Sequence, residues 1–274
     1  MNIYEINSPF LKGIKATLTA YPTPIGSENS AVKRPAVIIC PGGSYHHCSY
    51  REGRPVALRY QAYGMSAFVL EYSVDGKTFP AALCELAEAV RFVRENAEKW
   101  YVDPTKIIVC GFSAGAHLAA SLAVHYDSDF MKDIFGDADI RPFAQILSYP
   151  VITSGEYSHK GSIRSICGET PSRELLERVS LEKQVDSNTP PAFIWHCTDD
   201  KTVPVQNSIM YMNSLSMAGV SFEAHIYPEG GHGIALCDDT ALKNDDMSYL
   251  NENASQWFNA SLNWIRRICS VKYR

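Results

Sequence analysis

A serine between two glycines, in the segment GFSAG at residues 111–115, is the first feature of the sequence that could do chemistry. The apolar run before it is typical of a buried strand, and the small and apolar residues after it are typical of a helix. A turn this tight crowds the backbone, which explains the glycines on either side of Ser113. It would also present the Ser113 hydroxyl at the carboxyl end of the strand. In this context Gly-x-Ser-x-Gly predicts a nucleophile rather than a serine that caps the helix.

A nucleophilic serine needs a base that removes its proton and a third group that orients the base. Among the eight histidines, His232 is the best candidate for the base, because it follows the apolar run 222–227 in the glycine-rich segment YPEGGHG. This position would bring it to the end of the sheet where Ser113 lies. His196, which ends another run, is a lesser alternative. His117 lies one helical turn after Ser113, and we expect a structural role for it.

Two adjacent carboxylates, Asp199 and Asp200, follow the run 191–197 and are the candidates for the orienting acid. An acidic pair in a turn is usually solvated, but the presence of Ser113 and His232 favours a functional interpretation. The chain order Ser, Asp, His is the order expected for a triad on this kind of sheet. Spacing alone does not separate Asp199 from Asp200.

Acyl transfer also requires N–H donors that face the developing oxyanion. One donor should be the N–H of Ala114, directly after the candidate nucleophile. Another should come from the segment PGGSYHH at residues 41–47, which follows the strand-like run 35–40. In the same segment, three side chains are candidates for contact with a substrate: Tyr45, His46 and His47. Tyr149 and Trp195 are further candidates, although aromatic residues at strand ends more often belong to the core.

Short apolar runs bounded by turn residues predict the elements that would position these groups, at residues 35–40, 66–72, 106–112, 144–150, 191–197 and 222–227. They are nearly continuous rather than alternating, as expected of strands covered on both faces. Helical patterns lie between them, and Pro80 suits the first turn of one helix. Strands that alternate with helices predict a parallel, doubly wound sheet, and the first thirty residues should add an antiparallel hairpin at one edge.

The bulk properties disfavour several classes of protein. A formal net charge of −5 without a long basic run gives no electrostatic reason to expect nucleic acid or an anionic membrane as a partner. No secretion signal or membrane-spanning stretch is recognisable. The eight cysteines form no C-x-x-C pair, so we expect buried thiols, a reducing compartment and, by default, a cytoplasmic location. Residues 1–274 should form one domain, with 153–185 as a small lid insertion.

Four segments together resemble the α/β-hydrolase superfamily, and within it the small esterase/lipase group of acetyl esterases, acetylxylan-esterase-like and BD-FAE-like proteins. They are CPGGSYHHCSYREGRPVALRYQAYGMSAFVLEY, YVDPTKIIVCGFSAGAHLAASLA, HCTDDKTVPV and YPEGGHG. The resemblance covers roughly residues 35–268. It implies an α/β-hydrolase fold, with a mostly parallel, doubly wound sheet of about eight strands and helices on both faces. A small insertion should follow the sixth strand, without a large cap domain.

The resemblance also assigns roles to residues. It implies Ser113 as nucleophile and His232 as base. The acid of the family precedes a short x-x-Val-Pro segment, which selects Asp200. Related esterases often have His-Gly-Gly-Gly where this chain has PGGS. By position, the implied oxyanion donors are the N–H groups of Gly43, Ser44 and Ala114.

The sequence therefore predicts a serine carboxylester hydrolase that works through an acyl-enzyme without a metal or an organic cofactor. A small insertion and no large cap favour a short acyl group, and the resemblance indicates acetylated sugars as small-molecule substrates. An arylformamidase, a peptidase or an acyltransferase could use the same triad, and a fold resemblance does not select among them. The alternative from a different class is a non-catalytic binding protein on a hydrolase fold, which the complete triad disfavours. A homodimer is compatible with the sequence, but no pattern indicates one.

Overall fold

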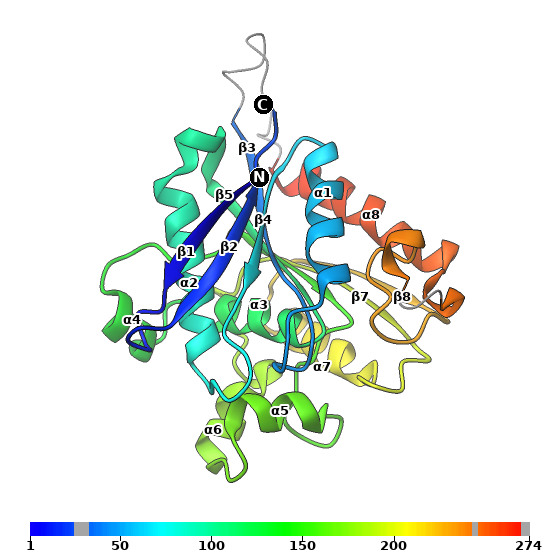
Figure 1. Ribbon diagram of the computed structural model, residues 1–274. Helices are drawn as coiled ribbons and strands as arrows, with labels where there is room; N and C mark the ends of the chain where they lie inside the picture. Colours follow the sequence, from blue (N-terminus) through cyan, green and yellow to red (C-terminus); the bar gives the residue numbers. More distant parts are fainter. Residues whose placement is uncertain (25–32, 243–245, 270–274) are drawn as a thin grey trace.

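The computed structural model describes residues 1–24, 33–242 and 246–269, and its central element is a twisted eight-stranded sheet (Figure 1). The strands are β1 (Asn2–Asn7), β2 (Lys15–Tyr21), β3 (Arg34–Cys40), β4 (Ser66–Glu71), β5 (Val102–Phe112), β6 (Ala144–Ser148), β7 (Ala192–Cys197) and β8 (Phe222–Tyr227). Their order across the sheet is β1-β2-β4-β3-β5-β6-β7-β8. The strands from β3 to β8 are mutually parallel, and β1 and β2 form an antiparallel hairpin at one edge.

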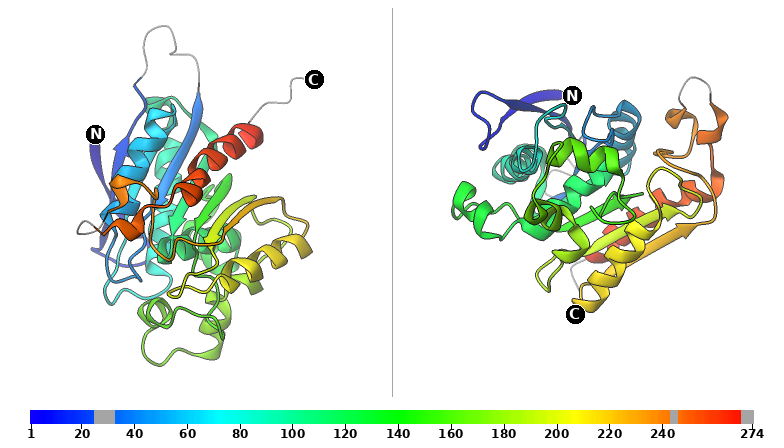
Figure 2. Two further views of the ribbon diagram at one scale, coloured as in Figure 1. Left: turned by 90° about the vertical axis from the view of Figure 1, so that its right-hand side faces the viewer. Right: turned by 90° about the horizontal axis from the view of Figure 1, so that it is seen from below.

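Helices cover both faces of the sheet (Figure 2). They are α1 (Arg54–Ala62), α2 (Ala81–Glu95), α3 (Ala114–His125), α4 (Asp129–Phe135), α5 (Lys160–Cys167), α6 (Arg173–Val179), α7 (Gln206–Met217) and α8 (Glu252–Cys269). Within the described ranges, none of them is long and apolar enough to cross a membrane.

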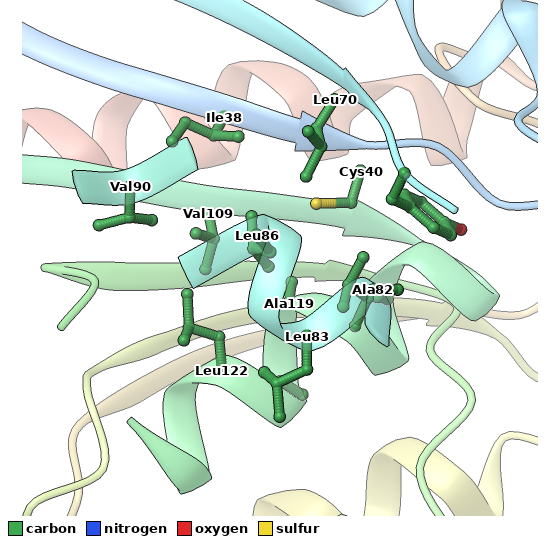
Figure 3. Close-up of a cluster of buried hydrophobic side chains, with 14 of the residues drawn as sticks. Ile38, Cys40, Leu70, Ala82, Leu83, Leu86, Val90, Val109, Ala119 and Leu122 are labelled. Carbon is green, nitrogen blue, oxygen red and sulfur yellow. The ribbon is translucent and has the colours of Figure 1, made fainter. Parts of the chain in front are cut away.

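Alternate side chains of β3 show how one strand contributes to two cores. Val37 and Ile39 pack in a cluster that includes buried residues of α1 and α8. Ile38 and Cys40 point to the other face and pack in a cluster that includes buried residues of α2 and α3. Figure 3 shows the second cluster. Because both faces of the strand are buried, its sequence is a continuous apolar run rather than an alternating one.

The predicted mostly parallel, doubly wound sheet of about eight strands is confirmed, as is the hairpin expected in the first thirty residues. Residues 25–30 of that segment lie outside the described part. Several boundaries differ from the prediction, and two of them have a reason in the structure. The strand β5 begins at Val102 rather than at residue 106, because Val102 pairs with Arg34 across a shift in register. Pro80 is the N-cap of α2 rather than part of its first turn, a position where its missing N–H also needs no partner.

The segment 153–185 follows β6, as predicted, and lies beyond the carboxyl ends of the parallel strands, at the bottom of Figure 1. It contains α5, α6 and a short 3₁₀ turn. Two buried histidines of α3 hold the end of α6. The Nε2 atom of His117 lies 3.0 Å from the carbonyl oxygen of Val179, and Nε2 of His125 lies 3.1 Å from that of Arg178. The insertion is therefore attached to the helix that follows the candidate nucleophile.

Candidate active site

Ser113 is the single residue between the last position of β5 and the first of α3. Its φ of 53° lies in a backbone region that residues other than glycine rarely adopt, and this conformation costs roughly 1–3 kcal/mol. The glycines at 111 and 115 are required for the predicted steric reason, because the turn leaves no room for a Cβ at either position. A Cβ on Gly115 would lie 2.0 Å from the carbonyl oxygen of Cys40, and one on Gly111 would lie 2.1 Å from that of Gly115. The turn is therefore pressed against the end of β3.

The structure brings the three candidate triad residues together in one chain of hydrogen bonds. The Oγ atom of Ser113 lies 2.9 Å from Nε2 of His232, and Nδ1 of His232 lies 2.7 Å from Oδ2 of Asp200. Because Asp200 accepts at Nδ1, the proton of a neutral imidazole is on Nδ1 and Nε2 can accept from the serine hydroxyl. The three come from the ends of β5, β7 and β8, as the carboxyl ends of parallel strands meet at one edge.

Asp200 is buried and bound on several sides. Its Oδ1 atom accepts the N–H groups of Thr202 and Val203, each at 2.9 Å, and its Oδ2 atom is also 3.2 Å from Nε2 of His196. Burial by itself would raise the pKa of this carboxyl, but hydrogen bonds from His196 and His232 hold the pKa well below its usual range. The carboxylate is therefore ionised near neutral pH and fixed in orientation.

The structure separates the two aspartates that spacing left equivalent. Asp199 turns away from the imidazole and accepts the N–H groups of Gly230 and Gly231, at 3.2 and 2.8 Å. These glycines belong to the segment 228–237 that carries His232, which we call the histidine loop. Asp199 therefore holds the backbone of the histidine loop. His196, the lesser candidate for the base, is fully buried beneath Asp200 and has no contact with Ser113.

Residues 41–47, which we call the oxyanion loop, follow β3 and lie beside the serine. Gly43, Ser44 and Tyr45 all have positive φ angles, of 133°, 57° and 60°. Among the described residues, the N–H groups of Gly43, Ser44 and Ala114 have no hydrogen-bond acceptor. The N–H of Gly42, in contrast, donates to the carboxylate of Glu52 at 2.8 Å. Free N–H groups beside a nucleophile are the donors that an oxyanion needs.

The side chains of the oxyanion loop differ in their access to a ligand. Tyr45 is only 2% exposed, and its hydroxyl lies 2.9 Å from Nδ1 of His117, so it is a core residue at the base of the loop. His117 thus has the structural position expected from the sequence. His46 is exposed, and its Nε2 atom is 3.0 Å from the hydroxyl of Ser165 in the insertion. His47 is also exposed. Of the three predicted contacts, only His46 and His47 face solvent.

Two further residues, Glu52 and His159, were given no role by the sequence, and a third, Tyr149, was a candidate for contact with a substrate. Glu52 is a buried carboxylate that contacts the oxyanion loop. Tyr149, expected as a pocket or core residue, is fully buried and packs edge-on against the ring of His232, with 4.9 Å between centroids. His159 of the insertion is partly buried, and burial, followed by the charge of His232, lowers its pKa. No sequence pattern marks Glu52 or His159.

A cavity of about 510 Å³ borders His232. Polar and aromatic side chains line much of it, among them Asp199, Glu229, Tyr249 and Asn251. Its volume lies in the range typical of small-molecule sites. Within the described ranges, no cluster of three or more His, Cys, Asp or Glu side chains could hold a metal ion.

A family model and two relatives match most of the chain. A family model described as BD-FAE matches residues 25–215. The chain is 43% identical to endo-1,4-beta-xylanase B of Butyrivibrio fibrisolvens over 243 residues, which are 86% of this chain and 36% of that protein. It is 32% identical to the acetylxylan esterase of Xylanibacter ruminicola over 209 residues, 73% of this chain and 41% of that protein. The chain thus spans less than half the length of these two relatives.

A solved structure resembles nearly the whole chain. The acetyl ester-xyloside bifunctional hydrolase from Caldicellulosiruptor lactoaceticus superposes with a TM-score of 0.81 and 35% sequence identity. The match covers 94% of this chain and 89% of that one.

The two histidines that anchor the insertion generate a prediction about pH. Burial lowers the pKa of His117 and of His125 to about 4. Between pH 6.5 and 4 the unfolded chain binds these protons and the folded chain does not, so stability should fall as pH falls, by about 1.4 kcal/mol per pH unit for each histidine. Urea unfolding at several pH values measures this slope. His125→Gln keeps an N–H donor for Arg178 but does not titrate, and its slope should be smaller; equal slopes would contradict the prediction.

Proposed function

The chain belongs to the BD-FAE family of α/β-hydrolase esterases, and from that premise we propose that it is a serine carboxylester hydrolase that removes acetyl groups from acetylated sugars. The observation that carries this proposal is the hydrogen-bonded chain from Ser113 through His232 to Asp200, beside N–H groups that have no acceptor within the described residues. This arrangement is the one that acyl transfer by a serine requires.

The reaction follows from the positions of these groups. His232 takes the proton of Ser113 as Oγ attacks the ester carbonyl, and Asp200 stabilises the imidazolium that forms. The oxyanion of the tetrahedral intermediate accepts hydrogen bonds from the N–H groups of Gly43 and Ala114, with Ser44 as a third donor. The intermediate collapses as His232 protonates the leaving alcohol. Water, deprotonated by His232, then attacks the acyl-enzyme, and His232 returns the proton to Oγ of Ser113 as the carboxylic acid leaves.

Two features support a short acyl group and a hydroxyl-rich alcohol. Because His232 protonates the leaving oxygen, the alcohol part of the substrate should lie on the side of His232, where the cavity of about 510 Å³ opens. Carboxylate, amide and phenol groups in its wall can bind several hydroxyl groups. The names of two relatives, an acetylxylan esterase and an acetyl ester-xyloside hydrolase, point to the same class of substrate.

The nucleophile is tested by Ser113→Ala. Hydrolysis of p-nitrophenyl acetate should fall by at least about 10³-fold, because the remaining groups cannot form the acyl-enzyme. Reaction with a fluorophosphonate probe should disappear in the same variant. Equal hydrolysis by wild type and variant would refute the proposed function, and a wild type that neither hydrolyses esters nor reacts with the probe would indicate a binding protein.

The two adjacent aspartates offer a matched pair of variants. Asp200→Asn should lower kcat by roughly 10⁴-fold, because an amide at this position favours the wrong tautomer of His232. Asp199→Asn keeps one oxygen acceptor for the N–H groups of Gly230 and Gly231, and should lower kcat by less than about tenfold. Steady-state kinetics on p-nitrophenyl acetate measure kcat for both variants. A reversed order of the two effects would transfer the role of the acid to Asp199.

The proposed binding site for the alcohol part is tested by comparing substrates that differ in that part. We expect acetylated xylo-oligosaccharides to be hydrolysed with a higher kcat/KM than N-formylkynurenine or a peptide. Tyr249→Ala should raise KM for the acetylated sugar by about three- to tenfold, the loss of one aromatic contact, and should leave p-nitrophenyl acetate unchanged. Tyr101→Ala is the control, because Tyr101 precedes β5 at the opposite end of the sheet. An equal change of KM for both substrates would contradict a sugar site in this cavity.

A further inference from the structure

We infer that Glu52 is a positioning residue for ester hydrolysis, whose buried carboxylate holds the oxyanion loop and the histidine loop in place around Ser113. This inference rests on the proposed function, since the two loops have this role only if the site transfers acyl groups. Glu52 lies in the short 3₁₀ turn Tyr50–Glu52, just after the oxyanion loop, and is 3% exposed.

The carboxylate of Glu52 accepts two hydrogen bonds from different parts of the site. The N–H of Gly42 donates to Oε2 at 2.8 Å, and the hydroxyl of Tyr149 donates to Oε1 at 2.7 Å. No Lys, Arg or His forms an ion pair with Glu52 within the described ranges. A buried carboxylate without a cation depends on such hydrogen bonds for its stability, and it therefore constrains the groups that donate them.

The first of these bonds fixes the oxyanion loop against the nucleophile. Gly42 packs directly on the serine turn, because a Cβ added to it would lie 2.8 Å from the carbonyl oxygen of Phe112 and 3.0 Å from Cβ of Ser113. With its N–H bound to Glu52, Gly42 cannot rotate its peptide plane freely. Gly43, whose N–H has no acceptor among the described residues, is the next residue in the chain. Glu52 thus sets the position from which this donor reaches an oxyanion.

The second bond reaches the histidine loop through Tyr149. The Tyr149 hydroxyl accepts the N–H of Ala235 at 3.0 Å, and its ring lies against the ring of His232. Burial, and then the charge of Glu52, raises the pKa of Tyr149 well above its ordinary value, so the hydroxyl keeps its proton and remains a donor to Glu52. One carboxylate therefore connects the donor loop and the base.

Arg51, the residue before Glu52, also binds the histidine loop. Nη1 of Arg51 donates to the carbonyl oxygens of Gly233 and Ala241, at 2.9 and 2.8 Å, and its guanidinium lies 4.5 Å from the ring centroid of Tyr249. Arg51 thus binds the histidine loop directly, and Glu52 binds it through Tyr149. This double attachment couples the two loops mechanically.

The test is Glu52→Gln, which preserves size and removes one of the two acceptors. Its amide oxygen can still accept from Gly42, but its NH₂ group cannot accept the hydroxyl proton of Tyr149. We expect kcat for p-nitrophenyl acetate to fall about 10–100-fold while KM stays within about threefold, because displaced donors and base weaken binding of the transition state and not of the ester. Tyr149→Phe keeps the ring against His232 and removes the hydroxyl, and it should lower kcat in the same way.

The matched control is Glu85→Gln. Glu85 is another buried carboxylate, fully shielded from solvent, and it accepts hydrogen bonds from the N–H and the hydroxyl of Ser73. It has no hydrogen bond to either loop. The control should lose a similar amount of thermal stability and keep kcat within about threefold of wild type.

Two results would overturn the inference. The first is a kcat within threefold of wild type in Glu52→Gln and in Tyr149→Phe. The second is an equal loss of kcat in Glu85→Gln at the same decrease in Tm. If Glu52→Gln does not fold, Tyr149→Phe decides by itself. Failure of the proposed function is distinguishable, because wild type and Ser113→Ala would then hydrolyse esters equally or not at all.

Discussion

The close contact between the serine turn and the end of β3 is the constraint on which the rest of the site depends. Gly115 lies where any side chain would collide with the carbonyl oxygen of Cys40. Since β3 and β5 are neighbouring parallel strands, this contact brings the segment after β3 and the turn after β5 into one small volume. The loops after β7 and β8 then bring the candidate acid and the candidate base to the same edge of the sheet.

Buried hydrogen bonds, rather than apolar packing, determine the orientation of the groups at this edge. Asp200 accepts from two backbone N–H groups in addition to the histidines, and Glu52 accepts from the oxyanion loop and from Tyr149. Each carboxylate loses solvation on burial and recovers it only when all of its donors are in place. An arrangement of this kind has few alternative geometries, which suits a site that must present donors and base without rearrangement.

The residues predicted well from the sequence are those whose local pattern is tied to a strand end. Ser113 and His232 each follow a strand and lie close to glycines in the sequence. Both lie at the carboxyl end of the sheet, as the sequence predicted. Asp199 and Asp200 share one turn, so their spacing does not separate them, whereas the family resemblance selects Asp200 and the folded turn gives the two carboxylates different partners. Tyr45 looked accessible because its neighbours are polar, but the left-handed conformation of the loop turns it into the core. Glu52 lies among charged residues, and its burial depends on contacts with distant segments.

The anchoring of the insertion has an evolutionary consequence. The imidazoles of His117 and His125 bind the end of α6 through the carbonyl oxygens of Val179 and Arg178. Every amino acid has such an oxygen, so mutations that replace side chains in α6 leave these two attachments available. The surface above the strand ends can therefore diverge in sequence among descendants of a common ancestor while the helix that follows Ser113 stays the same. Variation in this segment would change which molecules reach the site without altering the chemistry performed there.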